Sequence, residues 1–106
     1  MARMRFNIVL APEAARQLRA LSSHVRAEVL DAIERHLRHE PEKLSRSRIK
    51  RLRGLARPQY RLRVGEVRVF YDVEEERVEV LAIIDKAQAA AWLEEEGEGT
   101  EEGRGS

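Results

Sequence analysis

The sequence predicts an α+β domain in which helices pack on a small, mostly antiparallel sheet. The 106 residues fit one domain and leave little room for a second. Apolar residues alternate with polar residues near the N-terminus and again in three segments after residue 59, which is typical of half-buried strands. Between these segments, apolar residues recur at helical spacing. We therefore expect an N-terminal strand, a two-helix hairpin, a three-stranded antiparallel meander that completes a four-stranded sheet, and a short C-terminal helix.

The first half of the chain contains the predicted strand and helical hairpin. Residues 4–10 alternate in polarity and indicate a strand. Pro12 fits the first turn of a helix that continues to about residue 21. Ser22 or Ser23 can cap a second helix, which we expect from about residue 24 to 40 and which Pro41 ends. The apolar stripe of this second helix consists of Val25, Val29, Ile33 and Leu37.

The second half contains a predicted hairpin around Gly65 and Glu66, after a connector over residues 42–58. Glycine at the first central position favours a two-residue turn. With this turn, Arg63 lies opposite Arg68, and Arg61 lies opposite Phe70. One face then carries Tyr60, Leu62, Val64, Val67, Val69 and Tyr71, and the other carries Arg61, Arg63, Arg68 and Phe70.

A third strand over residues 77–84 and a helix over residues 86–95 complete the predicted domain. The strand is apolar on both faces in its second half, as expected for a central strand. We assign residues 1–93 to a single domain. Residues 94–106 are rich in Glu and Gly without periodicity, and we expect them to form a disordered acidic tail.

The composition excludes several classes of protein. The chain has no cysteine, which removes disulfides and thiolate metal sites. Neither a signal peptide nor an apolar run of membrane-spanning length is present. We expect a soluble, cytoplasmic protein without a metal or organic cofactor.

Charge is strongly segregated although the formal net charge is only +1. Residues 1–93 carry 19 Lys and Arg against 13 Asp and Glu, whereas residues 94–106 carry six Glu and one Arg. Nine basic residues but only one acidic residue, Glu66, fall between residues 46 and 68. A basic body of this kind indicates a polyanionic partner.

The candidate site is the arginine-bearing face of the predicted hairpin. Arg63 and Arg68 are like charges placed directly opposite, which is unfavourable unless an anion lies between them. With Arg61 they could bind phosphates of a nucleic-acid strand, and the connector residues Lys50, Arg51, Arg53 and Arg57 could extend the patch. The alternative is a solvated face, or one whose arginines pair with Asp72 and nearby Glu residues.

Other chemistries have weaker support in the sequence. His36 and His39 with Glu40 are spaced along one helix, but a solvated helix face explains them better than a metal site does. The serines lie in no nucleophile motif. Trp92, the single Trp, is by default a core anchor, and a base-stacking platform is the alternative.

The basic stretch resembles the signature region of the RelE/ParE superfamily of bacterial toxins. The resemblance rests on Leu52-Arg53-Gly54, on the strand Tyr60-Arg61-Leu62-Arg63-Val64, on Gly65, and on Arg68-Val69-Phe70-Tyr71. The order of the predicted elements is also similar, and the resemblance covers roughly residues 4–93.

The resemblance implies the toxin of a type II toxin–antitoxin system, most simply a ribosome-dependent mRNA endonuclease that inhibits translation. In such members the ribose 2′-OH attacks the adjacent phosphate, and basic side chains stabilise the developing charge. By position, the family's catalytic basic residues match Arg61, Arg63, Arg68 and Lys86. The family's aromatic residue matches Trp92 by position. Together with the connector residues that extend the basic patch, this gives predicted RNA contacts at Lys50, Arg51, Arg53, Arg57 and Trp92. The implied partners are mRNA on the ribosome and a cognate antitoxin with an acidic, amphipathic segment.

The chain departs from the family pattern at positions that matter for catalysis. Arg61 and Arg63 stand where relatives use a Lys that can act as a base, and Trp92 stands where relatives use a Tyr. Asp85 adds a negative charge beside Lys86. Two alternatives therefore stay open: a ParE-like inhibitor of DNA gyrase, and a non-catalytic module that binds an antitoxin or RNA.

Overall fold

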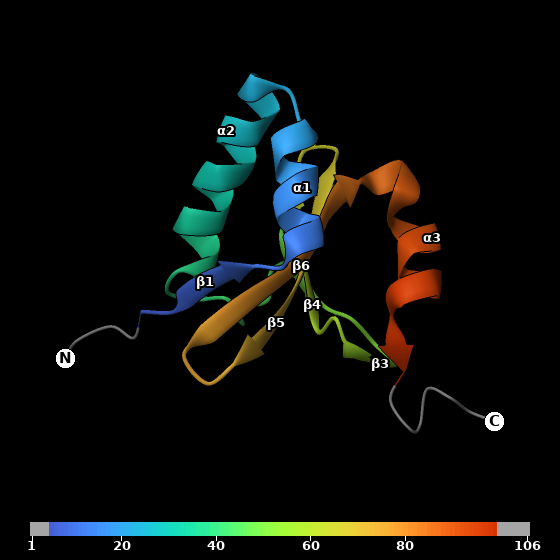
Figure 1. Ribbon diagram of the computed structural model, residues 1–106. Coiled ribbons are helices and arrows are strands. Elements are labelled where there is room, and N and C mark those ends of the chain that lie inside the picture. Colours follow the sequence, from blue (N-terminus) through green and yellow to red (C-terminus); the bar gives the residue numbers. More distant parts are fainter. Residues whose placement is uncertain (1–4, 100–106) are drawn as a thin grey trace.

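The computed structural model describes residues 5–99 and contains a five-stranded sheet with helices on both faces (Figure 1). The strand order is β1-β6-β5-β4-β2. β1 (Asn7–Leu10) runs parallel to β6 (Arg77–Asp85), and every other pair in this sheet is antiparallel. The remaining strands are β5 (Val67–Glu74), β4 (Tyr60–Val64) and β2 (Ile49–Arg51). The predicted α+β class and order of elements are confirmed.

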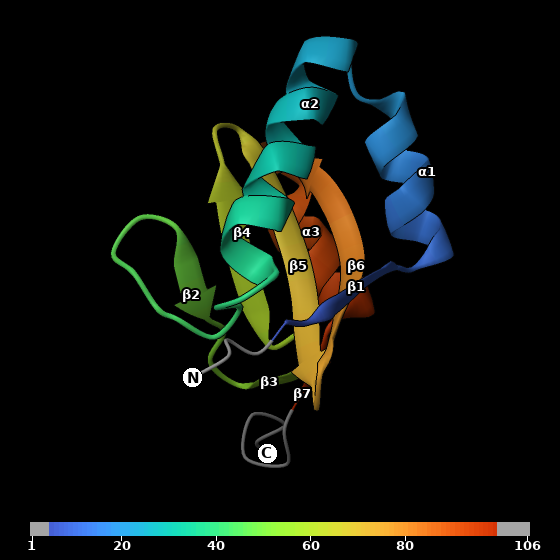
Figure 2. The ribbon, with the colours of Figure 1, turned by 90° about the vertical axis from the view of Figure 1, so that its left-hand side faces the viewer.

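Two helices cover one face of the sheet, and a third lies behind it (Figure 2). α1 (Pro12–Ala20) and α2 (Ser23–Ala32) form the predicted hairpin, and α2 continues as the π-helical turn η1 (Ile33–Leu37). α3 (Lys86–Glu96) packs on the opposite face over Phe70, Ala82 and Ile84. Each face of the sheet therefore has its own apolar cluster.

The helical hairpin is fixed at its turn by capping. The Ser22 hydroxyl accepts a hydrogen bond from the backbone N–H of Val25 at 3.4 Å. The Arg26 guanidinium donates to the carbonyls of Leu18, Arg19 and Leu21 at 2.9–3.3 Å. Because the last carbonyls of a helix lack intrahelical partners, Arg26 satisfies the end of α1 from within α2.

The central hairpin has the register that the sequence predicts. Gly65 has φ +59°, which suits glycine in the turn. Arg63 pairs with Arg68 and Arg61 with Phe70 across β4 and β5. The face carrying Leu62, Val69 and Tyr71 is buried under the helices. The Tyr71 hydroxyl donates a hydrogen bond to the carbonyl of Pro41 at 2.6 Å, which ties the sheet to the end of the helical layer.

Three short strands lie outside the predicted elements. The predicted connector over residues 42–58 contains β2, which adds a fifth strand beside β4, and β3 (Leu55–Arg57). β3 pairs with β7 (Glu98–Gly99) in a separate two-stranded sheet. The assignment of residues 94–99 to a disordered tail is therefore wrong, because they complete α3 and form β7. The rest of that predicted tail lies outside the described residues.

Within residues 5–99, no helix is long and apolar enough to cross a membrane. The predicted second helix also ends earlier than expected, at η1 rather than at residue 40. Met4, predicted to begin the first strand, lies outside the described part of the chain.

Candidate functional site

Four basic side chains come from three adjacent strands, on the sheet face opposite the helical hairpin. Lys50 of β2 lies opposite Arg61 of β4, and Arg63 of β4 lies opposite Arg68 of β5. These pairs share the strand face that points away from Leu62 and Val69, because side chains alternate along a strand. We call Lys50, Arg61, Arg63 and Arg68 the basic face.

Arg61 is the most constrained member of the basic face. Its Nε is buried and has no hydrogen-bond partner among the described residues. Burial lowers the pKa of Arg61, and the charges of Arg68 and Arg63 lower it further. A buried donor without an acceptor is costly. The other guanidinium donors of Arg61 reach solvent and can contact an anion. The geometry therefore makes Arg61 a natural contact for a phosphate oxygen.

Arg68 is held in place by the hairpin turn. Its Nη1 donates to the carbonyls of Gly65 and Val67 at 2.8 and 3.1 Å. Arg63, by contrast, is exposed. The basic face thus combines a partly buried guanidinium, a guanidinium fixed by backbone carbonyls, and an exposed one.

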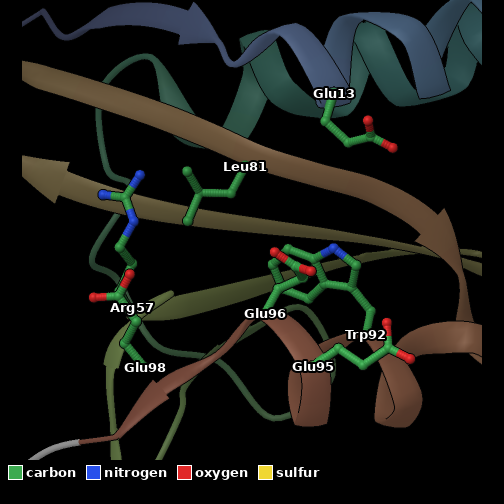
Figure 3. A pocket seen from close by; sticks show the side chains of 7 residues that line it. All are labelled: Glu13, Arg57, Leu81, Trp92, Glu95, Glu96 and Glu98. Atoms are coloured by element: carbon green, nitrogen blue, oxygen red, sulfur yellow. The ribbon is translucent and has the colours of Figure 1, made fainter.

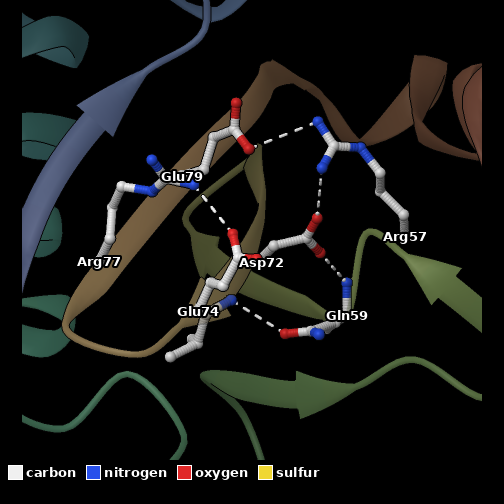
Figure 4. A network of polar contacts seen from close by, with 7 residues as sticks. Arg57, Gln59, Asp72, Glu74, Arg77 and Glu79 are labelled. Carbon is white, nitrogen blue, oxygen red and sulfur yellow. Dashed lines mark hydrogen bonds and ion pairs between the residues drawn. The ribbon is translucent and has the colours of Figure 1, made fainter.

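Asp72, which the alternative interpretation pairs with these arginines, pairs with another arginine instead. Asp72 accepts a hydrogen bond from Arg57 at 3.1 Å, and Arg57 also lies 3.4 Å from a carboxylate oxygen of Glu79 (Figure 4). Within residues 5–99, no ion pair reaches Arg61, Arg63 or Arg68. The alternative in which Asp72 pairs with the face is not what the structure shows.

The Arg57–Asp72 pair anchors the segment that leads into β4. Asp72 also accepts from the backbone N–H of Gln59 at 2.7 Å, and the Gln59 side chain accepts from the N–H of Val73 at 2.9 Å (Figure 4). Burial raises the pKa of Asp72, although the Gln59 N–H and Arg57 act in the opposite direction. Arg57, a predicted RNA contact, is thus engaged within the fold by carboxylates of β5 and β6.

The remaining predicted site residues are spread around the basic face. Arg51 lies on the other side of β2, with its guanidinium 5.3 Å from the centre of the Tyr60 ring. Arg53 is exposed in the turn beside Gly54. Lys86 begins α3 and lies 3.4 Å from a carboxylate oxygen of Glu66. Charge counting could not separate these residues from the basic face, because strand pairing decides which way each one points.

Trp92 packs on the sheet and borders an acidic cavity. Its ring stacks on Phe70 with centroids 5.1 Å apart. A cavity of about 530 Å³ beside it is lined by Glu13, Arg57, Leu81, Trp92, Glu95, Glu96 and Glu98 (Figure 3). Four carboxylates repel phosphate, so this cavity disfavours a nucleic-acid strand at the open side of Trp92.

Among residues 5–99, neither tyrosine of β4 and β5 is suited to exchange a proton near neutral pH. Tyr71 is fully buried on the opposite side of β5, and its burial raises its pKa strongly. Burial also raises the pKa of Tyr60, with a further contribution from Glu42. The arginines themselves stay charged. The site can therefore bind and stabilise negative charge but supplies no obvious general base.

The model for the family described as "ParE toxin of type II toxin-antitoxin system, parDE" matches residues 8–90. This span contains nearly the whole described fold, including the basic face. The chain belongs to the ParE toxin family. The resemblance to RelE/ParE toxins read from the sequence is thereby confirmed, and the chain is the toxin of a type II toxin–antitoxin system.

Solved structures of toxins share the fold of this ParE-family chain. A toxin–antitoxin complex RelBE2 from Mycobacterium tuberculosis matches with a TM-score of 0.63 and 22% identity, covering 76% of this chain and 98% of that one. An archaeal RelE–RelB complex from Pyrococcus horikoshii OT3 matches with a TM-score of 0.65 and 20% identity, covering 80% and 99%. A copper-bound mutant toxin from Helicobacter pylori matches with a TM-score of 0.53 and 16% identity, covering 78% and 97%. No curated protein gives a significant match.

Proposed function

We propose that this toxin inhibits translation as a ribosome-dependent mRNA endonuclease. The observation that carries the proposal is the cluster of Arg61, Arg63 and Arg68 on one sheet face without an acidic partner among the described residues. Three like charges held together raise the energy of the free protein, and a polyanionic substrate lowers it. Messenger RNA on the ribosome is such a polyanionic substrate, and a toxin that acts on it would be cytoplasmic.

The basic face supplies electrostatic stabilisation rather than proton transfer. When a ribose 2′-OH attacks the adjacent phosphate, a P–O bond forms to the 2′ oxygen and the bond to the 5′ oxygen breaks. Negative charge develops on the non-bridging oxygens, where Arg61 and Arg68 would bind. Arg63 and Lys50 would contact flanking phosphates. We assign the proton transfers to groups of the ribosome or the RNA, because the described residues offer no suitable base.

We further propose that a cognate antitoxin covers the basic face in the inactive complex. The similar structures from Mycobacterium tuberculosis and Pyrococcus horikoshii are toxin–antitoxin complexes. An acidic, amphipathic segment would pair with Arg61 and Arg68 and would exclude RNA from the same surface. The toxin then needs no metal or organic cofactor to be switched on, only release of this partner.

The family match favours a second candidate function, inhibition of DNA gyrase by binding. The description of the matching family names a ParE toxin. The described residues near the basic face offer no suitable general base, which is compatible with an inhibitor that binds its target without catalysing a reaction. In that case the basic face contacts an acidic surface of a protein. The two functions differ in their target, so one experiment separates them.

The test is translation in a purified cell-free system, with mRNA 5′ ends mapped by primer extension. We expect cleavage at ribosome-occupied codons for the wild type and none for an Arg61→Ala/Arg68→Ala variant. A parallel supercoiling assay with purified gyrase should show no inhibition. Intact mRNA together with blocked supercoiling would refute the nuclease and establish the second candidate.

A further inference from the structure

A second group of basic side chains surrounds a small cavity on the helical side of the edge strand β2. The cavity has a volume of about 160 Å³, and its polar lining consists of Arg35, His36, Glu40, Lys43, Ser45 and Arg48. These residues come from η1, from the turn that follows it, and from the loop that leads into β2. We call it the His36 cavity.

Positive charge dominates the His36 cavity. Arg35, Lys43 and Arg48 carry permanent charges, whereas Glu40 is the one acidic side chain among the described lining residues. Glu40 lies 3.8 Å from Lys43, and Asp31, outside the lining, lies 3.0 Å from Arg35. Arg48 forms no ion pair within residues 5–99. The cavity therefore retains a net positive charge.

His36 lines the cavity beside these basic side chains. Burial lowers the pKa of His36, the guanidiniums of Arg48 and Arg35 lower it further, and Asp31 acts weakly in the opposite direction. These effects favour the neutral form of the imidazole, which shares the cavity with Arg35 and Arg48. An anion bound between these groups would offset the repulsion and favour the protonated imidazole.

The loop that carries Arg48 is fixed before any ligand arrives. The Ser45 hydroxyl accepts hydrogen bonds from the backbone N–H groups of Arg48 and Ile49, both at 3.0 Å. The N–H of Ser45 donates to the carbonyl of Ile49 at 3.0 Å. Such local bonds order the backbone of the loop, so the main entropy cost of binding an anion is that of the Arg48 side chain.

The loop that lines the His36 cavity is joined by a backbone hydrogen bond to β4, a strand of the basic face. The carbonyl of Arg48 accepts a hydrogen bond from the N–H of Arg63 at 2.8 Å, and Lys50 follows two residues later. Arg48, which lines the cavity, and Lys50 of the basic face are thus two residues apart in the chain. The volume of the cavity is well below the range typical of drug-sized ligands and suits a single phosphate group.

We propose that the His36 cavity binds a backbone phosphate of the same RNA strand that crosses the basic face, with Arg48 and Arg35 as its charged contacts. The proposal rests on RNA as the proposed substrate and adds a second anchoring point beyond the cleavage site. Arg48 and Arg35 bind the phosphate oxygens, and His36 becomes a further donor when it is protonated. A strand held on both sides of β2 is fixed in direction across Arg61 and Arg68.

The first test follows the three imidazoles by NMR while pH is varied, in chloride and in inorganic phosphate at equal ionic strength. We expect phosphate to raise the pKa of His36, because an anion bound in the cavity favours the protonated imidazole. A His36→Gln variant assigns the signal. An Arg48→Gln variant should lose the response, and Arg48→Lys should retain part of it. An unchanged His36 titration in phosphate would overturn the proposal.

The second test distinguishes an RNA phosphate from free phosphate, without ribosomes. Binding of a single-stranded oligouridylate is measured over a range of salt concentrations for the wild type, Arg48→Gln and the matched control Arg16→Gln on the exposed side of α1. Loss of one phosphate contact to a single strand should reduce the slope of log K against log salt by about 0.7 in Arg48→Gln only. Equal slopes in all three proteins would overturn the proposed RNA contact. The cavity would then bind free phosphate only.

These readouts separate the cavity from the proposed cleavage. If the protein leaves mRNA intact in translation but the His36 signal responds to phosphate and Arg48→Gln lowers the salt slope of oligouridylate binding, the phosphate site stands and only the nuclease reaction fails. If mRNA is cleaved but neither phosphate nor RNA moves the His36 titration, the cavity proposal fails alone. Circular dichroism of each variant confirms that it is folded.

Discussion

Replacing Arg61 by methionine should make the protein more stable while abolishing its function. Met keeps an unbranched side chain of similar reach over the sheet but removes the guanidinium. In the wild type, the Arg61 Nε is buried without a partner among the described residues, and Arg68 and Arg63 repel its charge. Both unfavourable contributions vanish in Arg61→Met, so the free energy of unfolding should rise.

The size of this gain follows from two contributions. One unsatisfied buried donor costs about 1–3 kcal/mol. Relief from like charges on facing strands adds a few tenths of a kcal/mol. Because the side chain of Arg61 is only partly buried and its remaining donors reach solvent, the low end applies, and we expect a gain of about 1 kcal/mol. For a domain of this length, that gain corresponds to a rise in Tm of about 4–8 °C.

The assay is urea denaturation at neutral pH, supported by thermal unfolding. Arg63→Met is the matched control, since Arg63 is exposed on the same strand and has no orphaned buried donor. We expect the control to change the unfolding free energy by no more than about 0.5 kcal/mol. A destabilised Arg61→Met variant would contradict this reasoning, and so would equal unfolding free energies for the two variants. In either case the buried guanidinium of Arg61 would not lower the stability of the wild type.

Three further predictions concern the surroundings of the basic face. Trp92→Ala should lower the free energy of unfolding, measured in urea, by about 2 kcal/mol, because Trp92 is half-buried and its stacking on Phe70 is lost. An unchanged free energy would mean that Trp92 does not hold α3 against β5. Tyr71→Phe should lower the free energy of unfolding by about 1–2 kcal/mol, because it leaves the Pro41 carbonyl unpaired, but it should leave mRNA cleavage unchanged. Loss of cleavage in a folded variant would contradict the placement of Tyr71 outside the site. The pKa of Asp72 is raised on folding, so the folded protein binds its proton more tightly than the unfolded chain. The wild-type unfolding free energy should therefore fall relative to Asp72→Asn as pH rises above about 4, and a parallel pH profile would contradict this.

The central hairpin could be predicted because its signals are local. The turn at Gly65 fixes the register, and a one-residue slip would move every apolar side chain of β4 to the wrong face. The same alternation predicts which face carries Arg61, Arg63 and Arg68. The helical stripe ending at Leu37 is equally local, because it depends only on spacing within one segment.

The short strands could not be predicted because their partners are distant. β2, β3 and β7 have two or three residues each, too few for a periodic pattern. Arg57 looked like part of the basic patch, but its partner Asp72 lies 15 residues away on another strand. The His36 cavity was missed for the same reason, since the loop at Arg48 meets η1 only after folding.

The most direct test of the central claim is the rate at which mRNA on purified ribosomes is cleaved in a single turnover by wild-type protein and by Arg61→Met. We predict measurable cleavage by the wild type and a loss of at least about 100-fold in the variant, the effect typical of removing one stabiliser of developing charge. The variant must be folded and at least as stable as the wild type in the same preparation. Cleavage by Arg61→Met at the wild-type rate would contradict the account, because the basic face would then bind its target without acting on the reacting phosphate.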